Sequence, residues 1–199
     1  MRFLLPRVTW APIGSPRPPR VLRHRGDVPL LKTITGRQID LFNMTADDVD
    51  IIDIAHGLSR ICRFGGHVHG WLSVAEHCVR VAERCVANGR PDLALQALYH
   101  DAAEAYIGDM PSPIKHRSEM AVYRHLEHVV EAAIWEHMGW TFPIPEAAKK
   151  AIKQADIEIG TEDCAIWRYA PMRLDHEQAK LAFLDAHLMY SRTNFATAA

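Results

Sequence analysis

The sequence predicts an all-α fold, a helical bundle that follows a short N-terminal hairpin or extended arm. Three observations support this prediction. From about residue 45 onward, apolar residues recur at helical spacing in one segment after another. Capping residues, glycines and prolines separate these segments, as they do at the ends of helices. A chain of 199 residues with a hydrophobic content of 48% is long enough for one sizeable core and short for two.

Composition narrows the class of protein. The formal net charge is −1, so nothing indicates binding to nucleic-acid polymers or to an anionic membrane. No segment approaches the roughly 20 apolar residues that a membrane-spanning helix needs. The four cysteines form no CxxC pair, which favours reduced thiols in a cytoplasmic protein. The chain has 12 histidines, which is the first indication of metal or proton chemistry.

The first part of the chain differs in composition from the rest. Residues 1–29 are rich in proline and arginine and lack periodicity, so we expect a mobile or loosely attached arm. Residues 30–199 are expected to form a single domain. At its start, residues 28–42 alternate moderately around Thr35 and Gly36, which predicts a short hairpin.

The first predicted helix begins at Asp47, with Thr45 as its N-cap and an apolar face that continues to Ile61. The segment RFGGHVHGW, residues 63–71, follows it as a loop because glycine and polar residues dominate it.

The second predicted helix begins after Ser73, where Glu76 completes a capping box, and it ends at Gly89. His77 lies on its buried side, beside Cys78. A single histidine in such a place is ordinarily a core residue with a hydrogen-bond partner, so His77 alone does not indicate a metal site.

The segment LALQALYHDAAEAYIGDMPSPIK, residues 93–115, predicts a helix that ends at Gly108. His100 and Glu104 stand one turn apart and would share a face of this helix. Asp101 lies ~100° further round, and Asp109 follows the end of the helix. A histidine–aspartate pair alone is weak evidence, because an exposed polar pair explains it as well.

Three further helices are predicted over residues 118–138, 146–170 and 176–190. In the second of them, Asp156 falls beside an apolar stripe. A charge on the inner face of a helix is costly unless it is paired or bound to a metal, so Asp156 needs a partner. The last helix has an apolar face that indicates packing or a subunit contact, and we expect a dimer or higher homo-oligomer. This face comprises Ala179, Ala182, Phe183, Ala186 and Leu188.

Four candidate metal ligands thus lie on separated segments, each at or beside an inward position: His77, His100, Asp101 and Asp156. Two imidazoles and two carboxylates suit one divalent first-row metal that keeps positions open for water or substrate oxygens. The expected cofactor is one divalent transition metal, namely Co, Mn, Zn, Ni or Fe, with Mg as a further candidate.

The order of these motifs resembles the HD-domain phosphohydrolases, in particular the bacterial 5′-deoxynucleotidase (YfbR-like) branch and the similar phage-type deoxynucleoside triphosphohydrolases. The resemblance covers about residues 35–190 and is carried by SVAEH at 73–77, ALYHDAAEAYIGDMPSPIK at 97–115 and KQAD at 153–156. It implies an HD-type helical bundle in which His77, His100, Asp101 and Asp156 bind the metal. It also implies that Glu104 and Asp109 act near the attacking water.

The resemblance further implies a substrate-binding arginine before the first ligand. Arg60 matches this position, and Arg63 is the competing match. The loop at 63–71 is longer here than in the 5′-deoxynucleotidase, which leaves the size of the substrate open. Other groups that flank the site are candidates for stacking on a base or clamping phosphate, although loop polarity, core packing or surface placement explains such residues as well: Phe64, His67 and Lys115.

The sequence therefore predicts a metal-dependent phosphohydrolase that acts on deoxynucleotides, either a 5′-deoxynucleotidase or a dNTP triphosphohydrolase. The alternative is a non-catalytic HD module that senses metal and nucleotide without turnover. A helical structural protein with scattered histidines is a third hypothesis. Glu104 argues against the sensor, because a sensor needs no carboxylate that activates water.

Overall fold

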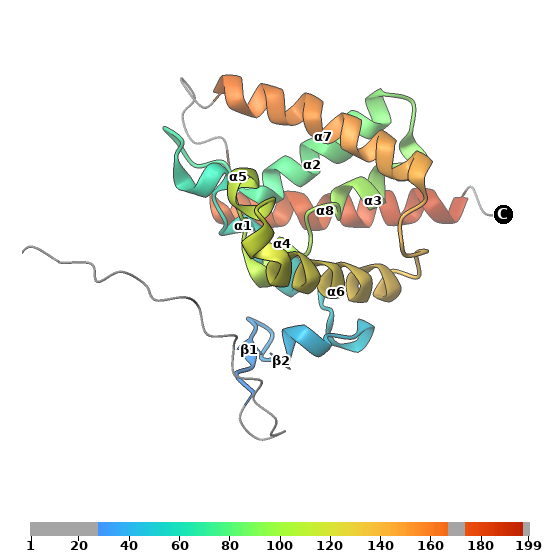
Figure 1. Cartoon of the computed structure of the whole chain (residues 1–199). Helices are drawn as coiled ribbons and strands as arrows, with labels where there is room; N and C mark the ends of the chain where they lie inside the picture. The colour runs from blue at the N-terminus through green and yellow to red at the C-terminus, as the bar shows by residue number, and fades with distance from the viewer. Residues whose placement is uncertain (1–27, 167–173, 197–199) are drawn as a thin grey trace, which may run out of the picture.

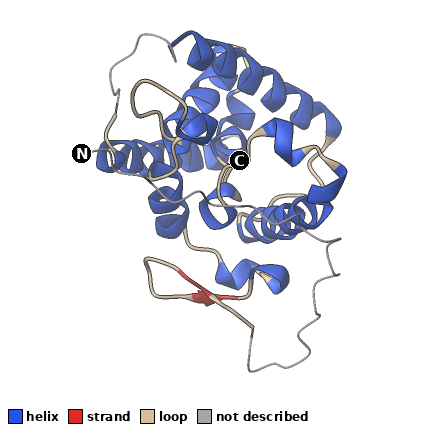
Figure 2. Cartoon of the chain, turned by 60° about the vertical axis from the view of Figure 1, so that its left-hand side comes forward, coloured by secondary structure: helices blue, strands red, loops and turns tan. Residues whose placement is uncertain are grey.

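The computed structural model describes residues 28–166 and 174–196. Helices dominate these ranges, and the one sheet within them pairs β1 (Leu31–Lys32) with β2 (Gln38–Ile39) in antiparallel register. The all-α prediction and the predicted hairpin are therefore confirmed. Figure 2 shows the helices gathered in one bundle, with the hairpin at one end of it. Most of the predicted N-terminal arm lies outside the described residues, so it stays a prediction.

The helices differ greatly in length. In chain order they are α1 (Ile51–Ser59), α2 (Val74–Ala87), α3 (Ala94–Leu98), α4 (Glu104–Ile107), α5 (Ser112–Lys115), α6 (Ala121–His137), α7 (Glu146–Ile166) and α8 (His176–Ala196). The 3₁₀ turns are η1 (Leu41–Asn43), η2 (Ala46–Asp48), η3 (Arg63–Gly66), η4 (Pro91–Leu93) and η5 (Ser118–Met120). Figure 1 shows α7 and α6 on opposite sides of the bundle, with α2 and α8 between them.

Helix α2 is the central element of the fold because it packs against α1, α3, α7 and α8. It begins as predicted, since the Ser73 hydroxyl accepts a hydrogen bond of 3.1 Å from the Glu76 amide. Its apolar face is fully buried and comprises Val74, Cys78, Val81, Ala82 and Cys85. Burial of this kind is worth roughly 25 cal/mol per Å² of apolar surface, so α2 contributes much of the core.

The hairpin is attached to the bundle by a buried carboxylate. Asp53 on α1 is 5% exposed and accepts hydrogen bonds from the Thr35 amide at 2.9 Å and from the Thr35 hydroxyl at 2.7 Å. Because a buried carboxylate without partners is costly, this pair of bonds holds the hairpin turn against α1.

The predicted start and end of the first helix are wrong. Thr45 caps the separate turn η2, and α1 begins only at Ile51, where the Asp50 carboxylate accepts from the Ile52 amide at 2.9 Å. The helix also ends at Ser59, before Ile61. Thr45 and Asp50 both suit an N-cap and occur close together, and Asp50 is the one that caps α1.

The predicted continuous helix up to Gly108 is also wrong, because it is interrupted over residues 99–103, between α3 and α4. The His100 side chain explains this break. Its Nδ1 donates to the Ala97 carbonyl at 2.8 Å, and that carbonyl would accept the Asp101 amide in a continuous helix. The backbone instead forms tight turns in which several amides bond three residues back, such as Ala102 to Tyr99 at 3.0 Å.

Helix α8 is a core helix that packs on α1, α2 and α3, and it extends beyond the predicted end at Tyr190. Most of its predicted apolar face points into the bundle, but Leu188 is 55% exposed, so its predicted place on that face is wrong. The oligomeric state stays a prediction. Within the described ranges, none of the helices combines the length and the apolar character that crossing a membrane requires.

Gly57 allows α1 and α4 to approach closely. A Cβ atom at this position would lie 2.7 Å from the Ala105 carbonyl oxygen, which is closer than real Cβ atoms come. The backbone of the short helix α4, which carries Glu104, therefore rests directly on α1.

We predict that Gly57→Ala lowers the free energy of unfolding by about 1–3 kcal/mol, because the added methyl group must push α4 away. Gly160→Ala is the matched control, since Gly160 also lies in a helix but nothing lies within 4 Å of its Cβ position. This variant is expected to gain about 0.5–1 kcal/mol from helix propensity. Urea unfolding with a chelator present measures both values, and equal stability of the two variants would contradict this packing.

Candidate functional site

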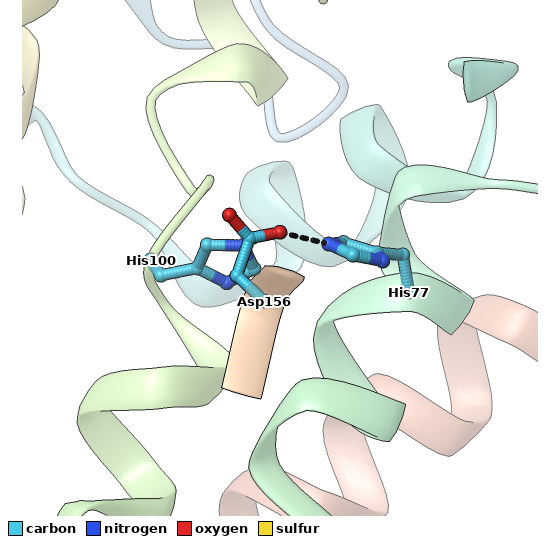
Figure 3. A group of neighbouring side chains, drawn as sticks. All are labelled: His77, His100 and Asp156. Carbon is cyan, nitrogen blue, oxygen red and sulfur yellow. Dashed lines mark hydrogen bonds and ion pairs between the residues drawn. The ribbon is translucent and has the colours of Figure 1, made fainter. Parts of the chain in front are cut away.

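His77 lies one turn into α2 and is completely buried. Its Nδ1 is 2.9 Å from a carboxylate oxygen of Asp163, and its Nε2 is 3.1 Å from Asp156 Oδ1. Both ring nitrogens face carboxylates, which can only accept, and the shorter contact favours the proton of a neutral ring on Nδ1, towards the completely buried Asp163. Figure 3 shows the contact between His77 and Asp156, which is made by Nε2. In this tautomer, the Nε2 lone pair faces that carboxylate.

His100 lies in the break between α3 and α4, with its ring beside that of His77 at a centroid distance of 5.3 Å. Because its Nδ1 donates to the Ala97 carbonyl, its Nε2 carries the lone pair in the neutral ring. This Nε2 is buried and has no hydrogen-bond partner among the described residues. Two imidazoles thus point their basic nitrogens into one enclosed space, a common arrangement in protein metal sites.

Asp101 and Asp156 complete this group. Asp101 Oδ2 lies 3.0 Å from His100 Nε2 and 3.9 Å from His77 Nε2. Asp156 Oδ1 lies 3.8 Å from His100 Nε2. Donor atoms that share one first-row metal stand about 3–4.5 Å apart, because each is about 2.1 Å from the ion. The residues present therefore fit a single divalent metal, because the buried Nε2 of His100 makes no hydrogen bond within the described residues and faces two carboxylates at ion-pair distance.

The carboxylates of this group favour positive charge beside them, and Lys153 already pairs with Asp156 at 2.6 Å. Burial raises the pKa of Asp101, but the neighbouring His100, His77 and Arg63 outweigh burial and bring the pKa below its usual range. Burial lowers the pKa of His100, and Asp101, Cys78 and Asp156 outweigh it in the opposite direction. Asp101 and Asp156 thus favour positive charge at the His100 ring. A bound metal ion supplies positive charge there, as a proton does.

Cys78 adds a sulfur atom close to the same space. Its Sγ lies within 4.8 Å of donor atoms of His100 and Asp101, so these three residues form a second set of potential ligands. Burial raises the pKa of the Cys78 thiol, which keeps it protonated and a poor ligand at neutral pH. The oxygen and nitrogen set described above is therefore the better candidate.

Glu104 and Asp109, the two predicted catalytic carboxylates, both interact electrostatically with Asp101. Glu104 begins α4, is 8% exposed, and its buried Oε2 has no hydrogen-bond partner among the described residues. Burial, and then Asp101 and Asp109, raise the pKa of Glu104 well above its usual range. Burial also raises the pKa of Asp109. Carboxyl groups whose pKa is raised by burial and by neighbouring carboxylates are candidates for proton transfer.

The structure distinguishes the two candidate arginines by their contacts. Arg63 Nη1 is 3.9 Å from Asp101 Oδ2, and its buried Nε has no hydrogen-bond partner among the described residues. Arg60 instead pairs with Glu177 on α8 at 2.5 Å and with the end of α1. The structure thus brings Arg63 to the candidate metal ligands and directs Arg60 to α8.

The remaining substrate-binding candidates differ in position. The Phe64 ring packs under the Arg63 guanidinium at 5.3 Å, and its backbone adopts a left-handed conformation with φ of 57°. Lys115 is partly buried in an ion pair with Glu127. Burial lowers the pKa of Lys115, but Glu127, and then Glu104 and Asp101, raise it on balance. His67 is exposed at the end of η3.

Asp163 and Glu131 are two residues near this region that the sequence does not single out. Asp163 is completely buried, contacts His77 and Arg80, and stands two helical turns after Asp156 on α7. That spacing was a usable signal, because it places both carboxylates on one face. Glu131 on α6 offered no such signal, since acidic residues at similar positions on a helix are usually exposed.

Comparison with known proteins places this chain among bacterial relatives. Residues 56–145 match the family described as 5′-deoxynucleotidase YfbR-like, a range that includes His77, His100 and Asp101 but ends before Asp156. The uncharacterized protein YfdR of Escherichia coli K12 is 34% identical over 145 residues, which are 69% of this chain and 76% of YfdR. An uncharacterized protein of Rhodobacter capsulatus is 37% identical over 131 residues, which are 63% of this chain and 66% of that protein.

The similarity extends more weakly to proteins that carry an enzyme name. The 5′-deoxynucleotidase YfbR of Escherichia coli O1:K1 / APEC is 30% identical over 99 residues. These are 48% of this chain and 40% of YfbR, so the chain spans less than half the length of that relative.

Glu131 generates a prediction about pH and stability. Burial, and then the Glu127 carboxylate, raise the pKa of Glu131 from 4.5 to about 7, against the opposing effect of Lys115 and Lys149. The folded protein therefore binds more protons than the unfolded chain between these values, and stability falls as the pH rises through this window. Glu131→Gln removes this effect and is expected to stabilise the protein at pH 8 by about 1–2 kcal/mol, after partial exposure is discounted.

The gain is expected to disappear below about pH 4.5, where both states hold the proton. Urea unfolding at several pH values, with a chelator present, measures it. Glu136→Gln, an exposed position on the same helix, serves as the control and should change little at any pH. A pH-independent difference between the Glu131 variant and the wild type would refute the assigned pKa.

Proposed function

Since this chain belongs to the YfbR-like family of HD-domain proteins, we propose that it is a metal-dependent phosphohydrolase that hydrolyses phosphate esters of nucleotides. The observation that carries the proposal is the convergence of two imidazole nitrogens and two carboxylates in one enclosed group, with a buried carboxyl group beside it. The deoxynucleotide monophosphate is the proposed substrate, because the relatives that carry an enzyme name are 5′-deoxynucleotidases.

In this proposal, His77, His100, Asp101 and Asp156 hold one divalent transition metal. Such an ion, when bound, neutralises charge on a phosphoryl oxygen and lowers the pKa of water towards ~7. Each imidazole can offer Nε2 because its Nδ1 is already occupied by Asp163 or by the Ala97 carbonyl. The two histidines therefore need no rearrangement to act as ligands.

Glu104 is proposed as the group that holds and deprotonates the attacking water, or that passes a proton to the leaving oxygen. Burial, and then Asp101 and Asp109, raise its pKa, which favours a role in proton transfer. Asp109 shares this proton or orients the water. The unpaired Oε2 of Glu104 is a buried acceptor that a water molecule or a substrate hydroxyl would satisfy.

Arg63 is proposed to bind the phosphate group, with Lys115 as a second candidate cation. A guanidinium can form two parallel hydrogen bonds to phosphate, and Arg63 directs its Nε to Asp163 and its Nη1 towards Asp101 beside the proposed metal ligands. Phe64 stacks beneath Arg63 and is placed to contact the sugar or base. The roles of His67 and Arg60 are secondary, because the contacts described for Arg60 lead towards α8.

The alternative, a sensor that binds metal and nucleotide without turnover, is less well supported. A sensor does not require a buried, unpaired carboxyl group next to the ligands, and burying one is costly.

The direct test of the proposed function is a panel of nucleotides incubated with the full-length protein and Co²⁺, Mn²⁺ or Zn²⁺. We expect inorganic phosphate from deoxynucleotide monophosphates, and no release when a chelator is present. Chromatography of the products distinguishes this result from the tripolyphosphate that a triphosphohydrolase would release. Binding of nucleotide without any product over several hours would favour the sensor instead.

We further predict that Glu104→Gln lowers kcat by about 10²–10⁴-fold while the metal still binds, because the amide keeps the shape but cannot take a proton. Glu119→Gln is the control, since Glu119 is exposed and pairs only with neighbours on the surface. Steady-state kinetics and the metal content after dialysis measure the two quantities. A Glu104 variant with unchanged kcat would remove this residue from the mechanism.

A further inference from the structure

Two carboxylates on one face of α7 hold the same imidazole from both sides. Asp156 Oδ1 is 3.1 Å from Nε2 of His77, and Asp163 Oδ2 is 2.9 Å from Nδ1 of the same ring. The two acidic residues are separated by seven positions, which is about two turns of an α-helix. Figure 3 shows the Asp156 side of this arrangement, where His100 lies close by. Asp163 therefore contacts the ring edge that faces away from the proposed metal.

Asp163 carries a charge that the interior must balance. Its side chain is completely buried, so a carboxylate there requires cationic or hydrogen-bonding partners. Arg80 on α2 donates to one of its oxygens. Arg63 Nε lies 3.4 Å from the other oxygen, within ion-pair distance but outside hydrogen-bond geometry. Both guanidinium groups are largely buried, with 12% and 14% of their side chains exposed.

Asp163 thereby connects three parts of the site that are distant in the sequence. It contacts the first proposed metal ligand, His77, and the proposed phosphate-binding residue, Arg63, which in turn lies 3.9 Å from Asp101. A neutral histidine can place its proton on either nitrogen, and only the Nδ1 form leaves Nε2 available to a metal. An acceptor at Nδ1 selects that form.

We infer that Asp163 is a positioning residue of the metal centre, which keeps the His77 proton on Nδ1 and holds Arg63 beside Asp101. This inference rests on the proposed function. Asp163 itself touches neither metal nor substrate and acts through these two side chains. The competing explanation is purely structural, namely that Asp163 only joins α7 to α2 through its ion pair with Arg80.

The test is the affinity of the chain for Co²⁺, measured by calorimetry on metal-free protein together with the visible spectrum of the Co²⁺ complex. Asp163→Asn preserves the shape but removes the charged acceptor, and we expect it to weaken Co²⁺ binding by about 10–100-fold. Its spectrum should also change, because the His77 ring loses its fixed orientation. A matching rise of KM with a smaller change in kcat is expected if Arg63 is displaced as well.

Two controls separate positioning from structural support. Arg80→Gln removes the ion pair between α2 and α7 by changing the arginine instead of the aspartate. It leaves the bond between Asp163 and His77 intact. Glu162→Gln alters the neighbouring residue, which pairs with Arg80 and Arg84 but does not contact His77. Both should bind Co²⁺ within about 3-fold of the wild type, a difference far smaller than a lost ligand-orienting bond produces.

The outcomes are distinct. Wild-type binding by Asp163→Asn, with an unchanged spectrum, overturns the inference and leaves the proposed function standing. If Asp163→Asn and Arg80→Gln weaken Co²⁺ binding equally, the structural explanation is supported and the inference that Asp163 positions His77 is also overturned. A wild-type protein that binds no Co²⁺, Mn²⁺ or Zn²⁺ refutes the proposed function itself, and the inference with it.

If Asp163→Asn fails to fold, a measurement on the wild-type protein tests whether Asp163 positions the His77 ring. Nitrogen-15 NMR of the Zn²⁺ complex reports which ring nitrogen of His77 carries the proton, with assignment by loss of the signal in His77→Gln. We expect a protonated Nδ1 that exchanges slowly with solvent, because Asp163 accepts it in a fully buried place. A proton on Nε2 would overturn the inference.

Discussion

The structure depends on how a helical core accommodates buried negative charge. Three aspartates, Asp101, Asp156 and Asp163, surround the imidazoles of His77 and His100 inside the bundle. A buried carboxylate without compensation costs several kcal/mol, so each must have a positive or donating partner. Asp163 has two arginines and an imidazole N–H. Asp156 pairs with Lys153 at 2.6 Å and Asp101 lies 3.9 Å from Arg63, and both carboxylates also face the imidazole nitrogens, where we propose the metal ion.

The same local interactions that shape the backbone also orient the site. The hydrogen bond from His100 to the Ala97 carbonyl accompanies the end of α3 and directs the basic nitrogen of the ring towards His77. The break that follows lets Asp101 turn towards both imidazoles, and α4 then resumes with Glu104 buried nearby. Gly57 permits this because α4 can rest on α1 without a side chain between them. The backbone break at His100 and the close contact at Gly57 therefore determine where the candidate metal ligands and Glu104 lie.

Much of the fold was accessible from the sequence because its signals are local. Ser73 occurs where a helix can begin, and its hydroxyl caps α2 in the structure. Asp156 stands beside an apolar stripe, and the carboxylate is indeed partly buried against His77. The break after Leu98 escaped prediction because alanines maintain helical spacing through it. Only the tertiary position of His100 shows why its side chain replaces a backbone hydrogen bond there.

Asp163 and the choice between Arg60 and Arg63 were inaccessible for a different reason. Each depends on partners more than 80 residues away or on a loop, and no local pattern encodes such a contact. An acidic residue on a helix is ordinarily solvated, and only the buried contacts with His77 and Arg80 give Asp163 its significance. Similarly, Arg60 and Arg63 are both plausible from spacing, but Arg60 turns to Glu177 on α8.

The central claim, that these side chains bind one cation, is tested most directly by locating the ion. Crystals grown with Co²⁺ and measured at the cobalt absorption edge would show its position by anomalous scattering. The structure predicts one strong peak about 2.0–2.2 Å from Nε2 of His77 and of His100, with carboxylate oxygens of Asp101 and Asp156 completing the ligands. The absence of a peak between the two imidazoles at saturating Co²⁺, or a peak held by other residues, would contradict the claim.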